Sequence, residues 1–336
     1  MLPLFRSNQF TTAIPLALYV VLLHLSALLG YVQPLANAVE GGLWYQSWFG
    51  WANDEPSFSA LAAAVLVFVQ ALMVNTLADK FRLMGDRNWF PGLFYVLVAS
   101  AFPEFLFVSA PLVAATFVPL SVWRIFNAFQ KPNMATAIFD SALWASVASL
   151  FYPPALLLLV AAFAGLEVVR VFRLRERFAF FAGAFVPLFL GWLWYFWADR
   201  GEAFRDVQWG RLFGFYRFDA VWDEKQMLKT ALAILLTVVF LMGLGSLNSR
   251  KGNQAQKFAS VLYWFLAVAG LSIFFRAEWR WEHLLLLSAA MGMLLAFTFQ
   301  SLRKRLWAEL WHLGILAIVL VIQFAGFFFN LSGSIF

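Results

Sequence analysis

Residues 58–77 read FSALAAAVLVFVQALMVNTL, a run without a single charged side chain. An α-helix rises about 1.5 Å per residue, so about 20 apolar residues cross the roughly 30 Å hydrocarbon core of a bilayer. This stretch therefore predicts a membrane-spanning helix. Apolar segments of the same kind recur along the chain on both sides of it. Including this stretch, the predicted spans are 12–32, 58–77, 89–102, 105–123, 136–151, 155–171, 179–198, 227–248, 258–275, 284–300 and 308–330.

The composition agrees with this pattern. The 336 residues are 63% apolar and 12% charged, whereas an average soluble domain has about 45–50% and about 25%. A soluble chain of this length could not hide 40 Phe and 16 Trp in its interior. The connections between spans are too short for an independent core. We therefore predict one all-α domain over 1–336, a polytopic transmembrane bundle of about 11 spans with short hairpins and interfacial helices.

The chain contains no cysteine, which excludes disulfides, thiolate metal sites, iron–sulfur clusters and cysteine nucleophiles. The net charge of +6 does not indicate nucleic-acid binding, because the basic residues stand in short groups between apolar segments. Membrane topology explains these groups better. Alternate connections hold 16 of the 24 Lys and Arg residues, and the other connections hold 12 of the 18 acids. Since positive loops stay in the cytoplasm, we expect a cytoplasmic N-terminus, a C-terminus outside and an outer working face.

Two of the predicted spans, 89–102 and 136–151, are too short to cross the core before prolines break them. They should form hairpins whose tips lie below the outer surface. The tip sequences Val98-Ala99-Ser100-Ala101-Phe102-Pro103 and Val147-Ala148-Ser149-Leu150-Phe151-Tyr152-Pro153 resemble each other. An internal duplication is one explanation and shared apolar composition is the other.

The first external loop, 43–57, is rich in aromatic residues, which predicts a short helix lying in the interface. Asp54 and Glu55 follow it directly. Two adjacent carboxylates can act as a general base or hold a divalent cation through oxygen ligands. The alternative is structural, because acids and Pro56 are also expected where a helix begins.

A second candidate site lies in the external loop 199–226, where Arg205 and Arg211 stand among aromatic residues. Guanidinium groups bind phosphate with two hydrogen bonds, so the loop is suited to a lipid phosphate. Interleaved acids such as Asp206 give the alternative, a surface loop whose charges neutralise each other.

The densest polar cluster runs from Arg276 to His283 at the mouth of the tenth span. On a continuous helix, Arg276, Arg280 and His283 would share one face. Two cations there would bind a diphosphate, and the imidazole would supply a proton. The alternative is an interfacial anchor, since Trp and Arg also fix helix ends at membrane surfaces. Within the spans, the acids Asp140, Glu167 and Glu309 are expected to pair with nearby cations.

Residues 109–130 and 138–152 resemble an uncharacterised family of multi-pass bacterial inner-membrane proteins. Some members of that family carry the label carotene monooxygenase. Carotenoid cleavage enzymes hold their iron with four histidines, and this chain has three. The resemblance therefore implies a bacterial inner-membrane location but not that chemistry.

The predicted architecture is also similar to that of the membrane glycosyltransferases of the GT-C type, which use polyprenyl-phosphate sugars. The similarity lies in the cytoplasmic N-terminus, the acidic first external loop and the short hairpins that follow. It implies that Asp54 or Glu55 is the catalytic base and that Arg276 and Arg280 hold the donor phosphate. That family usually has a second acidic site, for which only Glu104 is available here.

The leading hypothesis is therefore an envelope-biogenesis protein that handles a lipid-linked substrate, such as a polyprenyl-phosphate sugar, at the outer leaflet. The alternative is a non-catalytic subunit that assembles with other membrane proteins. A transporter ranks third, because most ionisable groups stand at the ends of spans rather than at mid-membrane. No organic cofactor is expected, and a divalent cation at Asp54 and Glu55 is left open.

Overall fold

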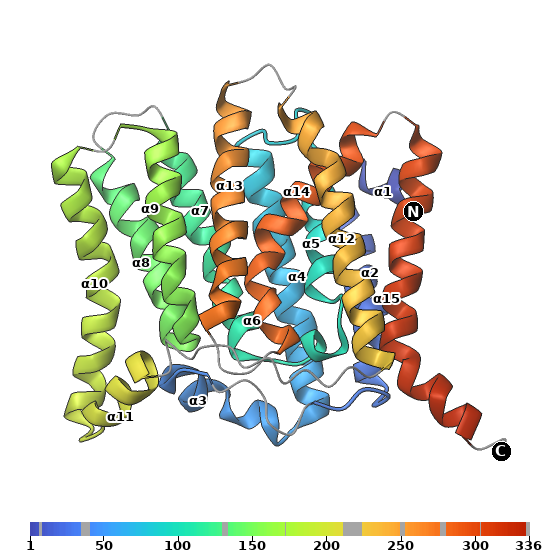
Figure 1. Ribbon diagram of the computed structural model, residues 1–336, viewed down its shortest axis with the longest axis horizontal. Coiled ribbons are helices and arrows are strands. Elements are labelled where there is room, and N and C mark those ends of the chain that lie inside the picture. The colour runs from blue at the N-terminus through green and yellow to red at the C-terminus, as the bar shows by residue number, and fades with distance from the viewer. Residues whose placement is uncertain are drawn as a thin grey trace.

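The computed structural model describes residues 1–6, 9–34, 41–129, 134–171, 173–210, 224–248, 253–275, 280–302 and 304–333. Within these ranges the chain forms helices and turns, with no strand. The predicted all-helical bundle is thereby confirmed (Figure 1).

The helices of the first half are α1 (Leu2–Phe5), α2 (Ala13–Leu28), α3 (Leu43–Phe49), α4 (Pro56–Lys80), α5 (Phe90–Ala99), α6 (Ala110–Ala115), α7 (Phe117–Asn127) and α8 (Ala135–Phe151). Those of the second half are α9 (Leu158–Val169), α10 (Leu174–Trp197), α11 (Gly201–Arg205), α12 (Glu224–Asn248), α13 (Asn253–Leu271), α14 (Ser288–Ser301) and α15 (Arg305–Gly333). Three short 3₁₀ helices matter for the site: η3 (Pro103–Leu106), η4 (Pro153–Leu157) and η7 (Trp281–Leu287).

Six helical stretches of the described chain are long and apolar enough to cross a membrane: 56–80, 110–127, 174–197, 254–274, 281–301 and 305–324. Five shorter apolar helices cover 13–28, 90–99, 135–151, 153–169 and 226–239. Each of the eleven predicted segments overlaps one of these helices. Length and composition thus support a membrane protein.

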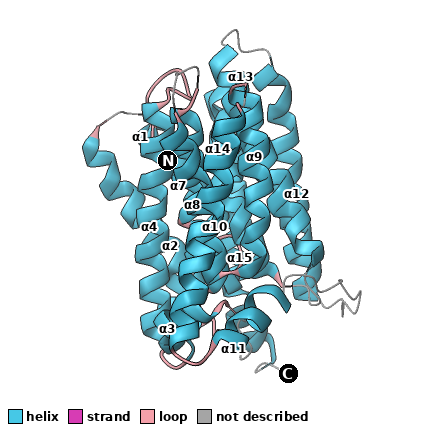
Figure 2. Cartoon of the chain, turned by 90° about the vertical axis from the view of Figure 1, so that its left-hand side faces the viewer, coloured by secondary structure: helices cyan, strands magenta, loops and turns pink. Residues whose placement is uncertain are grey.

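The bundle has two ends, which we name by a helix at each. The α1 face carries α1, and the opposite α3 face carries α3 and α11 (Figures 1 and 2). The predicted interfacial helix of the first loop is present as α3, followed by a 3₁₀ turn at Gly50–Asn53. The two short hairpins are α5 with α6, and α8 with α9, and both have their tips toward the α3 face (Figure 1).

The centre of the bundle is α5, in which every residue from Phe90 to Ala99 is buried. The helix α14 packs directly on it at Gly292, where an added Cβ would lie 2.7 Å from the Cα of Tyr95. Gln70 of α4 fixes the same region, since it accepts a hydrogen bond from the Tyr95 hydroxyl and donates to the carbonyl oxygen of Leu112. Small residues and internal hydrogen bonds of this kind allow close helix contacts in lipid.

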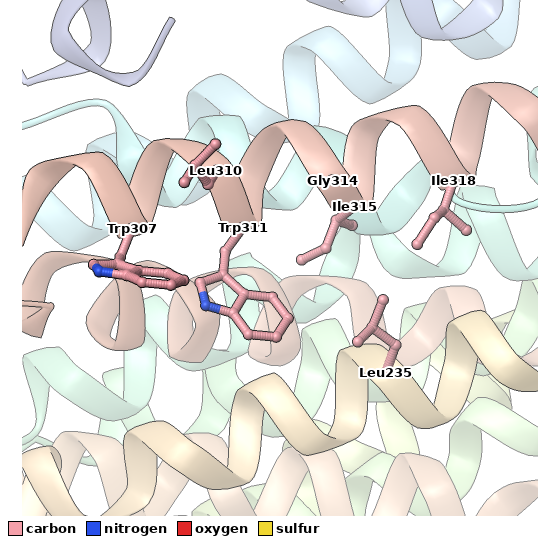
Figure 3. Close-up of a pocket in the computed structure, with 7 residues that line it drawn as sticks. All are labelled: Leu235, Trp307, Leu310, Trp311, Gly314, Ile315 and Ile318. Carbon is pink, nitrogen blue, oxygen red and sulfur yellow. The ribbon is translucent and has the colours of Figure 1, made fainter.

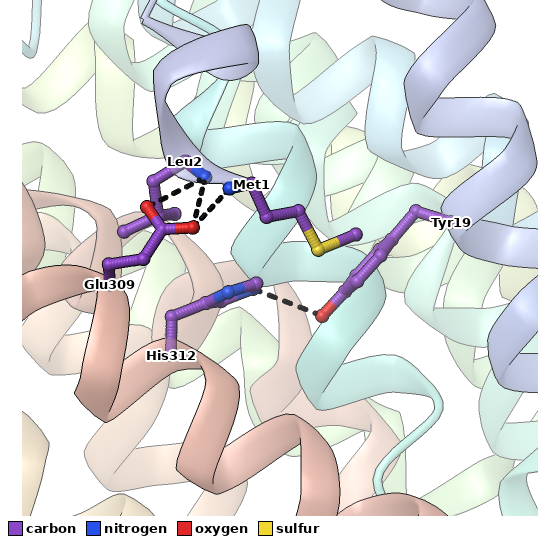
Figure 4. A network of polar contacts seen from close by, with 5 residues as sticks. All are labelled: Met1, Leu2, Tyr19, Glu309 and His312. Carbon is purple, nitrogen blue, oxygen red and sulfur yellow. Dashed lines mark hydrogen bonds and ion pairs between the residues drawn. The ribbon is translucent and has the colours of Figure 1, made fainter.

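At the α1 face, charged groups pair across neighbouring elements. Asp140 and Glu167 pair with nearby cations, as predicted: Asp140 lies 3.3 Å from Arg124, and Glu167 lies 3.2 Å from Arg177. Glu309 of α15 instead accepts hydrogen bonds from the amino group of Met1 and the backbone N–H of Leu2 (Figure 4). One turn further along α15, His312 Nε2 lies 3.2 Å from the Tyr19 hydroxyl of α2. These contacts fasten α1 and α2 to α15.

Candidate functional site

Both hairpins break at a proline, and the break is the same in local geometry. A 3₁₀ helix starts at Pro103 in the first and at Pro153 in the second. The residue before each proline, Phe102 or Tyr152, has an extended backbone. Proline imposes this, because its ring disfavours the helical conformation in the preceding residue. The chain therefore leaves the helix and presents an aromatic side chain at each tip.

The helix α3 contacts both tips. The Tyr45 hydroxyl donates to the carbonyl oxygen of Val108, beyond the first tip, at 3.0 Å. The N–H of Gly42, the residue before α3, donates to the carbonyl oxygen of Phe151 at the second tip, at 2.7 Å. A side chain at Gly42 would collide with the carbonyl oxygen of Leu150, so glycine is required there.

The 3₁₀ helix η7 also contacts both tips. Trp281 packs on Phe102 with ring centroids 4.8 Å apart. His283 stacks on Tyr152, and its Nδ1 lies 2.5 Å from the Tyr152 hydroxyl. We call the set Tyr45, Phe102, Tyr152, Trp281, Glu282 and His283 the hairpin junction. All six side chains are buried.

The hairpin junction holds a carboxylate among aromatic rings. Burial, and after it the negative charge of Glu282, raise the pKa of Tyr45. Tyr45 therefore stays protonated at neutral pH and keeps its hydrogen bond to Val108. A nearby negative charge has this effect because it disfavours the phenolate.

An ion pair lies beside the junction. Lys229 of α12 pairs with Glu104 of η3, and each side chain is only 11% exposed. The second carboxylate oxygen of Glu104, Oε2, is buried and has no hydrogen-bond partner in the described chain. The indole N–H of Trp281 donates to Gln226 of α12 at 2.7 Å. Through these two contacts α12 is joined to the first tip and to η7.

The residues predicted at the mouth of the tenth span are partly brought together. His283 is in the hairpin junction, and Arg280 immediately precedes η7 with an extended backbone. The expectation of one continuous helical face is therefore wrong at Arg280, because the helix begins only at Trp281. Arg276 lies outside the described residues.

Asp54 and Glu55 lie just before α4, and both are exposed. Glu55 occupies the N-cap position and Pro56 the first helical position, which agrees with the structural alternative for this pair. Neither carboxylate makes a hydrogen bond or an ion pair within the described chain. Ser59, one turn into α4, accepts a hydrogen bond from the N–H of Val108, so the start of α4 adjoins the first tip.

Of the two arginines predicted in the second loop, Arg205 ends α11 and lies 3.4 Å from Asp206. Both side chains are well exposed, as the self-neutralised alternative expects. Arg211 lies outside the described residues. In the part of the chain that the structure describes, no group of three or more His, Asp or Glu side chains is arranged to hold a metal ion.

The sequence reasoning missed Tyr45 and Tyr152 as members of the site. Tyr152 carried a signal, because it stands directly before Pro153 at a predicted break. Tyr45 carried none that distinguishes it from the other aromatic residues of the first loop. Their partners are 63 and 131 residues away in the chain, and such pairings are set by tertiary packing.

No protein-family model, no curated protein and no solved structure matches this chain.

Proposed function

We propose that this protein is an envelope-biogenesis membrane protein of glycosyltransferase-like architecture, which handles a lipid-linked, phosphate-bearing substrate at the outer leaflet of the bacterial inner membrane. The observation that carries the proposal is the hairpin junction, where Glu282, His283 and two tyrosines are buried next to the Glu104–Lys229 pair.

Polar groups in this position are costly. An ionised side chain placed in an apolar bundle costs several kcal/mol unless it is paired, and such groups usually serve a substrate or proton path. A scaffold could close two hairpin tips with apolar side chains alone. The buried Glu282 and His283, together with the nearby Glu104–Lys229 pair, support a ligand with a charged head group.

Each group has a role in the proposal. Arg280, at the start of η7, binds the phosphate of the substrate, together with Arg276. His283, held by the Tyr152 hydroxyl, donates or accepts the proton that accompanies transfer. Asp54 and Glu55 are the candidate bases, exposed at the start of the helix whose Ser59 binds the first tip. No resident metal is needed for these roles.

The orientation is part of the same proposal. Eleven crossings with a cytoplasmic N-terminus would place the α3 face outside. The overlap of each predicted segment with an apolar helix supports the number of crossings, and the excess of Lys and Arg in alternate connections supports the side. Topology reporters fused near Trp209 and after the chain end should both give an external signal. Cytoplasmic signals from both would overturn the proposal.

Lipid binding by purified protein in nanodiscs tests the site. The probes are a polyprenyl phosphate and the corresponding polyprenol, which differ only in the phosphate. We expect the wild type to prefer the phosphate, and Arg280→Gln to reduce that preference by roughly tenfold, about 1.4 kcal/mol. Arg205→Gln is the matched control, because Arg205 is exposed beside Asp206 and should leave the preference unchanged.

A wild-type protein that binds both probes equally would refute the proposal, and so would an Arg280→Gln variant that keeps the full preference. The carboxylates are tested separately. In cells that depend on this protein, Asp54→Asn with Glu55→Gln should abolish function while leaving the amount of folded protein and phosphate binding unchanged. Full function of that double variant would remove the catalytic role from the pair.

A further inference from the structure

An apolar groove lies on the side of the bundle between α12 and α15 (Figure 3). Its volume is about 280 Å³. The lining residues are Leu235, Trp307, Leu310, Trp311, Gly314, Ile315 and Ile318. The groove is separate from the hairpin junction. Its α15 residues start at the end of α15 near the α1 face, whereas the hairpin tips lie toward the α3 face (Figure 1).

The groove is open toward the surroundings. Trp307 is 55% exposed and Leu310 is 61% exposed. Gly314 is exposed and a Cβ there would meet no atom within 4 Å, so the lack of a side chain keeps this part of the groove open. Figure 3 shows both indole rings on the side of α15 that faces Leu235 of α12.

The length of the groove matches half a bilayer. From Trp307 to Ile318 the helix rises roughly 16 Å at about 1.5 Å per residue, and one leaflet of the hydrocarbon core measures about 15 Å. Tryptophan rings prefer the level of the lipid head groups. Trp307, in the first turn of α15, is therefore placed at the membrane surface and Ile318 near its middle.

Positively charged residues lie next to the end of the groove that is formed by Trp307. Lys304 and Arg305 are both exposed. Lys304 is tied into the helix start, because its carbonyl oxygen accepts the N–H of Trp307 at 3.1 Å. It immediately precedes α15 and lies three residues before Trp307 in the chain, so it is next to the Trp307 end of the groove. Glu309, the one acid of α15, accepts hydrogen bonds from the amino group of Met1 and the N–H of Leu2.

We propose that this groove binds an anionic phospholipid, with one acyl chain along Trp311, Gly314 and Ile318 and the phosphate between Lys304 and Arg305. The apolar lining fits the chain, and the two cations fit the negative head group. The site is independent of the proposed function, since it lies in the other leaflet and uses none of the same residues.

The test compares lipids retained by the purified protein after extraction into mild detergent with equal amounts of phosphatidylglycerol and phosphatidylcholine, counted by native mass spectrometry. We expect the wild type to retain phosphatidylglycerol in preference. Gly314→Trp fills the groove and should reduce retained phosphatidylglycerol by roughly tenfold. Val65→Trp is the control, because it adds the same ring to an exposed position on α4.

A second variant tests the head group without altering the groove. Lys304→Gln with Arg305→Gln should remove the preference for phosphatidylglycerol over phosphatidylcholine while the total of retained lipid stays the same. Arg175→Gln, an exposed arginine on α10, is its control. This pair decides the question even if Gly314→Trp does not fold.

Three results would overturn the proposal. The first is equal retention of the two lipids by the wild type. The second is a Lys304→Gln and Arg305→Gln variant that keeps the preference. The third is a Gly314→Trp variant that retains lipid normally but changes oligomeric state, which would assign the groove to a second copy of the chain.

Discussion

The two hairpins have closely similar tip sequences but different surroundings. The first, α5 with α6, is enclosed, since every residue of α5 is buried and α4 and α14 pack on it. The second, α8 with α9, packs on α10, which is the least buried of the six long apolar helices. One hairpin therefore has fixed neighbours on all sides, and the other has a neighbour that borders the lipid.

The same kind of hydrogen bond nevertheless stabilises both tips. The carbonyl oxygen of Ser100 accepts a hydrogen bond from the buried Gln323 of α15 at 2.7 Å. The carbonyl oxygen of Ser149, in the same motif position, accepts one from the buried Gln208 at 2.9 Å. Pro153 stands four residues after Ser149 and has no N–H to donate. The motif therefore leaves a carbonyl oxygen in need of a donor at each tip, and unrelated parts of the fold supply that donor.

The largest expected effect on stability depends on whether the helix packed against each hairpin can shift when one of its glycines gains a methyl group. Gly292→Ala places a Cβ 2.7 Å from the backbone of α5, and Gly183→Ala places one 2.2 Å from the carbonyl oxygen of Phe139 in α8. The helix α10, which carries Gly183, can shift into the lipid, whereas α14 cannot shift. We expect the free energy of unfolding in mixed SDS micelles to fall by about 3 kcal/mol for Gly292→Ala and by about 1 kcal/mol for Gly183→Ala.

Gly314→Ala controls for the substitution itself, because the space at Gly314 is open. It should leave the stability unchanged or raise it slightly. If Gly183→Ala were the more damaging variant, the contrast between an enclosed and a peripheral hairpin would be wrong.

An intermediate effect on stability tests whether the same kind of hydrogen bond stabilises both tips. Gln323→Leu and Gln208→Leu each leave a buried carbonyl oxygen without its donor, which should lower the free energy of unfolding by about 1–2 kcal/mol. Gln33→Leu removes an exposed bond to the carbonyl oxygen of Gly30 and should cost less than about 0.5 kcal/mol. If only one of the two variants, Gln323→Leu or Gln208→Leu, lost stability, the two tips would be alike in sequence but not in how they are stabilised.

The smallest effect on stability among the variants that test this comparison is expected at Tyr152, where the substitution should nevertheless alter the proposed function. Tyr152→Phe gives the second tip the same residue type that precedes Pro103 in the first, and removes the hydroxyl from His283. We expect less than about 1 kcal/mol of destabilisation and a loss of the preference for polyprenyl phosphate over polyprenol. Tyr195→Phe, which removes a hydroxyl bonded to Ser47 near the same face, should keep that preference.

Hydropathy predicted the helices well, because any segment that crosses lipid must be apolar and must satisfy its own backbone hydrogen bonds. It predicted the ends less well. The span expected to reach Phe102 ends as a helix at Ala99, since the backbone turns away before Pro103. Among the candidate site residues, His283 was predicted with its neighbourhood, and its partner Tyr152 was not. That pairing depends on where η7 meets the second tip, which spacing along the chain does not encode.

The burial of α5 also has a consequence for how the chain is made. Ten residues rise only about 15 Å, half the hydrocarbon core, so α5 is too short to be released into lipid as a stable segment by itself. Its principal neighbour is α14, which starts at Ser288 and leaves the ribosome almost 200 residues later. Until α14 has been made, the first hairpin must therefore be shielded by α4 or by the insertion machinery, and the native centre of the bundle can form only after that point.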